Sequence, residues 1–473
     1  IGARFVMGGG DNRAMHARPA PNNLPTAVPF GAALRFWLKL GCISFGGPAG
    51  QIAIMHRELV EQRRWISERR FLHALNFCML LPGPEAQQLA TYIGWLLHGT
   101  RGGIVAGALF VLPSLLLLVV LSAAYLAWGQ LPWVAALFHG IKAAVAAIVL
   151  HAMWRLGGKT LTTPLAWALA GGSFVALAWW KWPFPAVVLG AGAVGWLAAR
   201  VAPGQLVPPV AAPSAAAEST AVMGDDTPAP PHARFSRHGL ARVLLAGALA
   251  WLLSMGGLTA WQGLDATLTQ VGWFFSKAAL ITFGGAYAVL PYVNQAAVQQ
   301  HQWLTAAQMM DGLALGETTP GPLIMIVAFV GQLAATAEAM RACGVNGCGA
   351  WALGWGALGA LVATWFTFLP SFVFILAGGP LVESTRGKLG FTAPLAAITA
   401  AVVGVIGSLA LFFVANVALP SGAGAGWDSK IDWAALALVA AAAFALVRLK
   451  WGVIRVIALC ALAGGAWRWF GVG

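Results

Sequence analysis

Long apolar runs are the feature that most limits how this chain can fold. About 13 stretches are nearly free of charge, and turn residues or charged residues separate them. A membrane-spanning helix needs about 20 apolar residues, and these runs lack the period-two alternation of barrel strands. The sequence therefore predicts an all-α, polytopic integral membrane protein. The runs cover residues 30–48, 72–97, 104–127, 132–154, 163–180, 184–200, 240–260, 268–292, 307–334, 352–378, 391–416, 431–447 and 451–468.

The composition agrees with a membrane protein and argues against several functional classes. Charged residues make up only 9% of the chain, whereas soluble domains carry about 25%. The net charge of +13 is typical of cytoplasmic loops rich in Lys and Arg, so we expect no nucleic-acid partner. The sequence has no CxxC pair, no HExxH motif, no phosphate-binding loop and no set of nucleophile and base. We therefore expect no enzyme, no cofactor, no metal site and no catalytic residue.

A polar, proline-rich stretch divides the chain into two parts. Residues 201–238 are rich in Pro, Ala and Ser and show no apolar periodicity, which is typical of a flexible linker. We therefore expect a polar N-terminal segment at 1–29, a first half at 30–200, the linker, and a second half at 239–473.

The two halves carry the same helix-breaking motifs. With a shift of 238 residues, Phe45-Gly46-Gly47 meets Phe283-Gly284-Gly285, and Pro82-Gly83-Pro84 meets Pro320-Gly321-Pro322. The same shift aligns Phe36 with Phe274, Lys39 with Lys277, Ser44 with Thr282, and Trp65 with Trp303. So many matches without a gap indicate an internal repeat.

The second half also contains an insertion. Leu112-Pro113-Ser114 meets Leu369-Pro370-Ser371 only after the shift grows to 257 residues. This change predicts that about 20 extra residues lie near the stretch RACGVNGCGAWALGW of the second half.

The number of membrane crossings between the two copies decides their relative orientation. Seven runs separate the two starts, and an odd number of crossings inverts the second copy. Inverted repeats are typical of transporters, whose substrate site lies near the bilayer midplane. However, the arginine-rich stretch 56–70 would then lie outside the cell. If the runs 30–48 and 72–97 re-enter instead of crossing, that stretch stays cytoplasmic, and five crossings still invert the second copy. The sequence leaves both versions open.

The repeated motifs interrupt apolar helices and are the strongest candidates for a substrate site. A glycine inside a helix costs about 1 kcal/mol relative to alanine, so repeated Gly-Gly pairs indicate a required break. Unwound backbone in a membrane lines polar cavities, and helix N-termini bind anions. The competing interpretation is close helix packing through small residues. The predicted substrate-binding residues here are Phe45, Gly46, Gly47, Pro82, Gly83 and Pro84, and Phe283, Gly284, Gly285, Pro320, Gly321 and Pro322.

Matched polar side chains stand beside these breaks. Lys39 and Lys277 lie in apolar runs, five residues before the matched hydroxyls of Ser44 and Thr282. Charges inside a membrane are costly, so two symmetric lysines indicate an anionic substrate, unless they reach towards the headgroups. Two further candidates for substrate binding are Lys142 in the run 132–154 and Gln88, which follows the first Pro-Gly-Pro.

Three acidic residues lie near the Pro-Gly-Pro motifs. Glu85 directly follows the first motif, Glu317 precedes the second by three residues, and Asp311 lies about one turn or more before Glu317. They are predicted either to pair with the lysines or to carry protons that couple to transport.

The motif-bearing segments resemble the chromate ion transporter family. The first runs from FWLKLGCISFGGPAGQ to LPGPEAQQLATYIGW, and KAALITFGGAYAVLPYV with LGETTPGPLIMIVAFVGQ resembles that family's second domain. The resemblance covers about residues 30 to 465 apart from the linker. It implies two homologous halves of opposite orientation in a bacterial inner-membrane protein that exports chromate, with sulfate as competitor or counter-substrate. The halves differ where Ala286-Tyr287-Ala288 replaces Pro48-Ala49-Gly50.

The chemistry of chromate agrees with the predicted site. Chromate is a tetrahedral dianion with four acceptor oxygens, which suit backbone N–H groups, lysines and hydroxyls. We expect chromate and sulfate as substrates, the lipid bilayer as surroundings, and a cytoplasmic N-terminus and linker. The alternatives are a carrier for another tetrahedral oxyanion such as sulfate, an anion channel, or a membrane scaffold. Uniport, proton coupling, sulfate exchange and a homodimer stay open.

Overall fold

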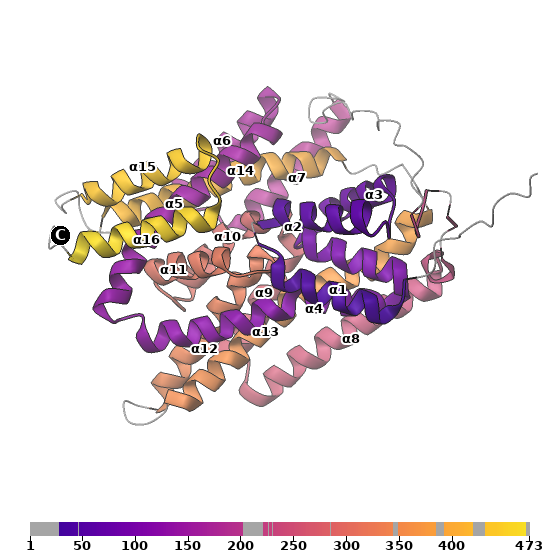
Figure 1. Ribbon diagram of the computed structural model, residues 1–473, viewed down its shortest axis with the longest axis horizontal. Helices are drawn as coiled ribbons and strands as arrows, with labels where there is room; N and C mark the ends of the chain where they lie inside the picture. The colour runs from indigo at the N-terminus through magenta and orange to yellow at the C-terminus, as the bar shows by residue number, and fades with distance from the viewer. Residues whose placement is uncertain are drawn as a thin grey trace, which may run out of the picture.

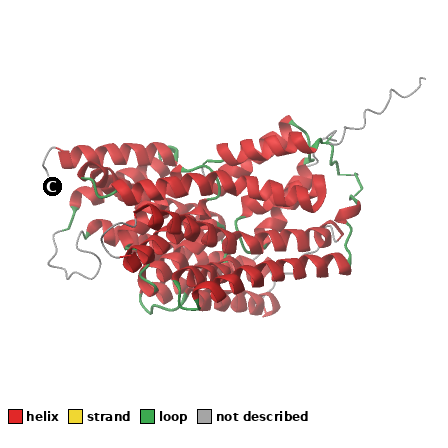
Figure 2. Ribbon diagram, turned by 90° about the horizontal axis from the view of Figure 1, so that it is seen from below, coloured by secondary structure: helices red, strands yellow, loops and turns green. Residues whose placement is uncertain are grey.

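The computed structural model is a bundle of helices (Figures 1 and 2). Within the described ranges the one strand-like pairing is an isolated bridge between Ile66 and Met223. In the part of the chain that the structure describes, seven helical stretches are long and apolar enough to cross a membrane, which confirms the predicted all-α polytopic class. The described residues are 28–45, 47–201, 221–225, 227–228, 230–283, 285–343, 349–384, 392–419 and 431–469.

Each half contributes the same sequence of short and long helices. The first half contains α1 (Phe30–Ile43), α2 (Gly47–His56), the π-helix η1 (Arg57–Gln62), α3 (Glu68–Leu80), α4 (Glu85–Trp128), α5 (Pro132–Thr160), α6 (Pro164–Ala178) and α7 (Phe184–Val201). A 3₁₀ turn η2 (Pro231–Ala233) and α8 (Arg237–Gln262) follow. The second half contains α9 (Thr267–Ile281), α10 (Ala286–Asn294), the π-helix η3 (Gln295–Gln300), α11 (Ala306–Thr318), the 3₁₀ turn η4 (Leu323–Met325), α12 (Ile326–Cys343), α13 (Gly349–Ser384), α14 (Thr392–Ala418), α15 (Trp433–Val447) and α16 (Val453–Trp469).

The backbone repeats in detail, which supports the internal repeat. Helices α3 and α11 both have 13 residues and start 238 positions apart. The described non-glycine residues with positive φ form two matched pairs, Arg64 with Gln302 and Lys181 with Lys450. The second pair reveals that α6 and α7 correspond to α15 and α16, a match that the sequence motifs did not show.

Helix α4 is a hairpin and not one straight rod. The backbone leaves helical geometry at His98 and Gly99, and a Cβ on Gly107 would collide with the Thr91 side chain. In a straight helix these two residues would lie about 24 Å apart. The first arm of α4 therefore returns towards the start of α1, where His98 Nε2 lies 2.8 Å from the carbonyl oxygen of Val28.

Helices α1 and α9 each end just before a buried residue, Ser44 or Thr282, which agrees with the re-entrant version of the prediction. Helix α1 has 14 residues and reaches only about 21 Å, whereas a bilayer core is about 30 Å thick. In Figure 1, α1, α2 and α3 lie right of centre, whereas α10 and α11 lie left of centre, on the side of the C-terminus. Five helical segments separate the two copies, namely the second arm of α4 and α5 to α8. We call α1 to α3 the first re-entrant unit and α9 to α11 the second, and we propose that they enter from opposite sides of the membrane.

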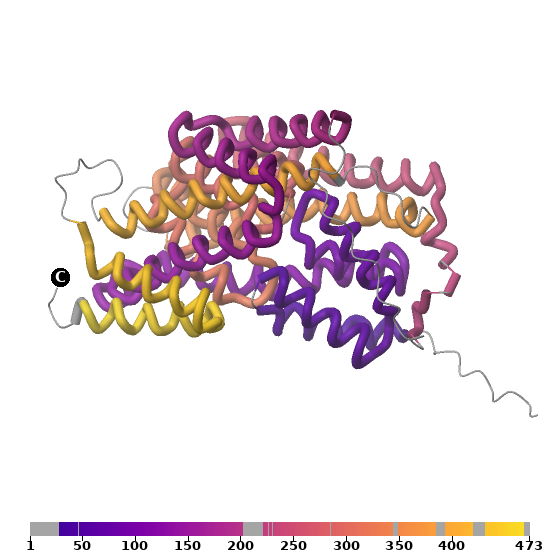
Figure 3. The backbone as a smooth tube through the Cα atoms, turned by 90° about the horizontal axis from the view of Figure 1, so that it is seen from above, coloured from indigo at the N-terminus to yellow at the C-terminus, as the bar shows by residue number. Residues whose placement is uncertain are grey.

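Several predicted segment boundaries were wrong because the motifs end helices. The runs 72–97, 268–292 and 307–334 each contain two helices, and the run 30–48 ends at Ile43 before a new helix starts. Helix α2 was not predicted. The insertion in the second half lengthens the α12–α13 hairpin relative to the α4 hairpin. Figure 3 shows the resulting bundle from above.

The end of the predicted linker is folded, which corrects the flexible-linker prediction for that part. Met223 donates its backbone N–H to Trp65, and Ser67 donates its backbone N–H to Met223. Residues 202–220 lie outside the described residues. Met223 and Ala233 also join a separate cluster of buried side chains that contains α1, α2, α3 and the first arm of α4. The first re-entrant unit therefore packs on the linker end.

Candidate functional site

Two reciprocal backbone hydrogen bonds join the broken helices of the two halves. The N–H of Gly83 donates to the carbonyl oxygen of Thr282 at 2.7 Å, and the N–H of Gly321 donates to that of Ser44 at 2.8 Å. Each bond joins a Pro-Gly-Pro motif of one half to the residue before Phe-Gly-Gly of the other. We call these four residues the crossing. Reciprocity of this kind is what an approximate two-fold axis between the halves produces.

The Pro-Gly-Pro sequences explain why the chain breaks here. Gly83 has φ +128° and Gly321 has φ +108°, a region that residues with a side chain rarely adopt. Pro84 and Pro322 then precede the starts of α4 and η4, and neither provides a side-chain cap. The first N–H groups of these helices therefore lack the usual capping oxygen.

The Phe-Gly-Gly sequences form the other two breaks. Gly47 and Gly285 have φ of +71° and +91°, and α2 and α10 begin there. Gly46 and Gly284 lie outside the described residues. Phe45 is exposed, whereas Phe283 packs against the larger hydrophobic cluster. The matched motifs thus start matched helices in different surroundings.

The two predicted hydroxyl donors already donate hydrogen bonds to carbonyl groups of their own helices. Ser44 Oγ donates to the Leu40 carbonyl at 2.6 Å, and Thr282 Oγ1 donates to the Ala278 carbonyl at 2.5 Å. Their backbone carbonyl groups, and not their hydroxyls, take part in the crossing.

Glutamine side chains make the two sides of the crossing unequal. Gln51 Nε2 donates to the carbonyl oxygen of Gly321 at 2.5 Å, and Gln88 Nε2 donates to that of Pro82 at 2.8 Å. Both side chains come from the first half, and the matching positions of the second half hold Val289 and Ile326. Gln51 was missed by the sequence analysis because it lies between the predicted runs 30–48 and 72–97. Its place four residues after the first Phe-Gly-Gly motif is the signal that could have identified it.

The three predicted acidic residues have different surroundings. Asp311 accepts a hydrogen bond from Tyr125 at 2.8 Å and lies 3.8 Å from Lys142 Nζ, so it belongs to an ion pair. Glu317 accepts a hydrogen bond from the hydroxyl of Tyr287 at 2.5 Å.

Glu85 lies against the start of α10. A Cβ on Gly285 would be 3.5 Å from its Oε1 atom. Among the described residues, no cation lies within ion-pair distance of Glu85 or of Glu317. These two carboxylates therefore differ from Asp311.

The matched lysines are not brought to the crossing. Lys39 is exposed at 55% of its side chain and lies 3.6 Å from Glu58 Oε1. Lys277 is also exposed, and its Nζ atom lies 5.9 Å from the ring centre of Trp273. Glu58 has no acidic counterpart, because Ala296 holds the matching position. The two lysines therefore have unlike neighbours on the outside of the bundle.

Helix α5 carries a cation that contacts the second re-entrant unit. Lys142 Nζ lies 3.8 Å from Asp311 Oδ2 of α11, and Arg155 and Lys159 lie near the end of α5. The equivalent helix α14 contains no charged residue. Positive charge is thus concentrated on one of two symmetry-related helices.

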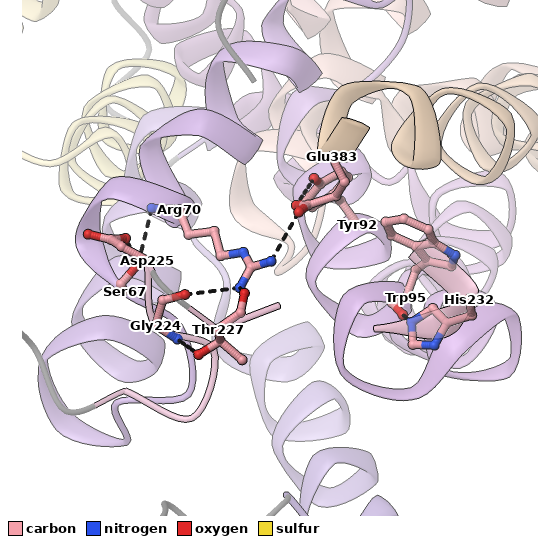
Figure 4. Close-up of polar contacts among 9 residues, drawn as sticks. All are labelled: Ser67, Arg70, Tyr92, Trp95, Gly224, Asp225, Thr227, His232 and Glu383. Carbon is pink, nitrogen blue, oxygen red and sulfur yellow. Dashed lines mark hydrogen bonds and ion pairs between the residues drawn. The ribbon is translucent and has the colours of Figure 1, made fainter. Parts of the chain in front are cut away.

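A buried ion pair joins the first re-entrant unit to α13 and to the linker end (Figure 4). Arg70 Nη2 lies 3.0 Å from Glu383 Oε2, and Tyr92 donates to Glu383 Oε1 at 2.7 Å. Arg70 Nη1 also donates to the carbonyl oxygens of Gly224 and Thr227. The sequence analysis treated Arg70 only as one of several loop cations, and its partner Glu383 is more than 300 residues away.

Broken helices that meet across an internal repeat, in an all-α polytopic chain, are typical of membrane transporters. The sequence profile described as Chromate transporter matches residues 32–196 and 269–465, so the chain belongs to the chromate transporter family. The two matched stretches extend from α1 to α7 and from α9 to α16 and leave out the linker and α8.

Curated relatives agree with this family. The chain is 30% identical to the chromate transport protein of Cupriavidus metallidurans, covering 78% of this chain and 79% of that protein. It is 31% identical to the chromate transport protein of Pseudomonas aeruginosa, covering 81% of each. It is 28% identical to a probable chromate transport protein of Synechococcus elongatus, covering 75% of this chain and 76% of the relative. No solved structure matches the chain.

Proposed function

We propose that this protein exports the chromate dianion from the cytoplasm across a bacterial inner membrane, with sulfate as a competitor. The observation that carries the proposal is the reciprocal pair of hydrogen bonds at the crossing, which brings the broken helices of both halves together. Inverted repeats bind substrates at such interfaces, and helix N-termini favour anions. The names of the relatives support chromate as the substrate.

The proposed site consists of the helix starts around the crossing. Backbone N–H groups after Pro84, Pro322 and Gly285 are the donors, because no side chain caps them. Gln88 adds an amide donor. Lys142 adds positive charge on α5, beside the route that we propose for the transported ion. Lys39 and Lys277 are left out of this proposal because both are exposed and the former has an acidic partner.

Glu85 and Glu317 are the proposed coupling groups. A carboxylate without a cation partner has no fixed counter-charge, so it is suited to exchanging a proton when a dianion enters or leaves. Asp311 is instead assigned to its ion pair with Lys142.

The proposed orientation puts the N-terminus and linker in the cytoplasm. In this orientation the η1–α3 turn, the α5–α6 turn and the α15–α16 turn share the cytoplasmic side with the start of α1. These turns, the α4 hairpin and the end of α7 carry Arg63, Arg64, Arg101, Arg155, Lys159, Arg200, Arg448 and Lys450. Positive charge accumulates on the cytoplasmic side of membrane proteins. Re-entry of α1 and α3 removes the conflict over residues 56–70.

Export of a dianion can use the membrane potential directly. One charge that crosses 100 mV changes its free energy by about 2.3 kcal/mol, so a dianion that leaves an inside-negative cell gains about 4.6 kcal/mol. About 1.4 kcal/mol corresponds to a tenfold concentration ratio, so this potential supports a gradient of about three decades. Exchange for sulfate would cancel this gain.

The test is radiolabelled chromate flux in proteoliposomes with an imposed potential, with and without sulfate on the opposite side. Protein-free liposomes are the control. Saturable chromate flux driven by potential alone supports electrogenic export. Flux that requires sulfate on the opposite side indicates an exchanger. If sulfate moves and chromate does not, chromate export is wrong, and flux that does not saturate with concentration indicates a channel.

A further inference from the structure

Two buried serine hydroxyls at matched positions have no hydrogen-bond partner. Ser114 of α4 is 0% exposed and Ser371 of α13 is 1% exposed. Neither Oγ atom makes a hydrogen bond with any described residue. Each serine follows a helix-interior proline, Pro113 or Pro370. A buried hydroxyl that makes no hydrogen bond is destabilising, so a pair of them at equivalent places requires an explanation.

Many other hydroxyls in this bundle donate a hydrogen bond within their own helix. A hydroxyl in an apolar helix commonly donates to the carbonyl group four residues earlier. The residues that do so here are Ser44, Ser254, Ser276, Thr282, Thr364, Thr367 and Thr399. Ser114 and Ser371 forgo this bond in both halves, so their hydroxyls remain available to a ligand.

Each serine lies against the Pro-Gly-Pro glycine of the opposite half. A Cβ on Gly321 would lie 2.6 Å from Ser114 Cβ and 3.0 Å from Ser114 Oγ. A Cβ on Gly83 would collide with Ser371 Oγ and would lie 2.6 Å from Gln88 Nε2. The glycines therefore leave room for the hydroxyls, and no other residue type would.

The helix starts that follow these glycines supply the second part of the arrangement. Helix α4 begins after Pro84, and the η4–α12 stretch begins after Pro322, and neither start has a side-chain cap. Each unpaired hydroxyl thus stands beside an uncapped helix N-terminus from the other half. A hydroxyl donor next to backbone N–H groups and a positive helix end is a combination that binds an oxyanion.

We propose that Ser114 and Ser371 donate hydrogen bonds to oxygen atoms of the transported tetrahedral oxyanion. The two serines position the ion at the two Pro-Gly-Pro helix starts and favour oxyanions over halides, because directional donors suit fixed acceptor oxygens. This inference rests on the proposed function, since it assigns residues to the same transport path. It concerns the tetrahedral oxyanion as a class, so it holds for chromate and for sulfate.

The test compares Ser114→Ala and Ser371→Ala with Ser122→Ala in flux assays on the full-length protein. Ser122 is the matched control because it is also buried, lies on α4 and lacks a partner. Unlike the two serines, it does not lie against a Pro-Gly-Pro glycine. Loss of a hydrogen bond to a charged group corresponds to about a tenfold or greater rise in KM for chromate and for sulfate. Ser122→Ala should leave KM within about twofold. Ser114→Thr, which retains the hydroxyl, should recover part of the affinity.

The outcomes separate this inference from the proposed function. If wild-type protein carries chromate and both alanine variants keep its KM, the serine assignment is wrong while chromate transport stands. If only sulfate is carried and the two variants raise the KM for sulfate, chromate export is wrong and the serine assignment stands. Equal effects of all three variants would also overturn the assignment. Purified protein whose melting temperature responds to neither chromate nor sulfate would overturn both proposals.

Discussion

Arg70 and Glu383 form a buried ion pair that ties the first re-entrant unit to a spanning helix of the second half. Their Nη2 and Oε2 atoms lie 3.0 Å apart, and both side chains are at most 5% exposed. The positions that the repeat relates to them hold Gln308 and Leu126. The tie therefore exists at one end of the molecule and has no equivalent at the other, although the backbone is symmetric.

Removal of one partner of this pair should be strongly destabilising. Arg70→Met leaves the Glu383 carboxylate buried without its cation, and such losses cost about 3–5 kcal/mol. We expect a clear fall in the melting temperature of the purified protein in detergent. Arg69→Ala is the matched control, because the neighbouring Arg69 is exposed, and its effect should stay within about 0.5 kcal/mol.

A second variant distinguishes loss of the pair from loss of packing. In the double variant Arg70→Met with Glu383→Met no charge is left buried, so much of the lost stability should return. If the double variant is as unstable as the two single variants combined, the ion pair is not the source of the effect.

The Pro-Gly-Pro glycines should not tolerate a side chain. Gly83→Ala forces alanine into φ +128° and against Ser371, and Gly321→Ala forces it into φ +108° and against Ser114. Backbone strain of this kind costs about 1–3 kcal/mol, and overpacking adds a similar amount. We expect transport to be lost and the melting temperature to fall. Gly171→Ala in α6 is the control, because a Cβ there meets nothing within 4 Å. Normal flux in both variants would contradict the role of the crossing.

The sequence predicted the class and the repeat because both are local signals. Apolar runs identify helices, and residues such as Gly83 and Gly321 mark breaks whatever the surroundings are. The sequence could not decide whether a helix spans the membrane or re-enters it, because a 14-residue helix followed by a break has the same composition as part of a longer run. Hydrogen bonds such as that from Gly83 to Thr282 favour re-entry, and they depend on tertiary contacts.

Side-chain partners were the least predictable part of the site. Lys39 and Lys277 occupy matched positions, but whether the helix face that carries a lysine is buried or exposed depends on packing that no motif encodes. Ser114 and Ser371 were visible in the sequence as part of a matched Leu-Pro-Ser motif, yet their lack of a partner appears only in three dimensions. Arg70 illustrates the same limit, since its partner comes from the other half.

The placement of the cations predicts that Lys142 matters more than the matched lysines. Lys142→Ala removes the cation from Asp311, which is buried, and leaves that carboxylate on the proposed path. We expect kcat/KM for chromate to fall about tenfold or more, which corresponds to about 1.4 kcal/mol. Lys39→Ala and Lys277→Ala should change it less than about twofold, because both side chains are exposed. Loss of transport in the latter two variants alone would restore the lysine pair as the charge of the site.

Opposed re-entry predicts that two equivalent glutamines lie on opposite sides of the membrane. Gln62 ends η1 and Gln300 ends η3, both are exposed, and they are 238 positions apart. In a cysteine-free background, Gln62→Cys in intact cells should react with a membrane-impermeant maleimide only after the cells are opened, whereas Gln300→Cys should react in intact cells. Gln302→Cys, beyond the end of η3, is the control for the second position and should be labelled in the same way as Gln300→Cys. Labelling of both glutamine positions from one side would show that the halves are parallel and would remove the basis for a site between inverted repeats.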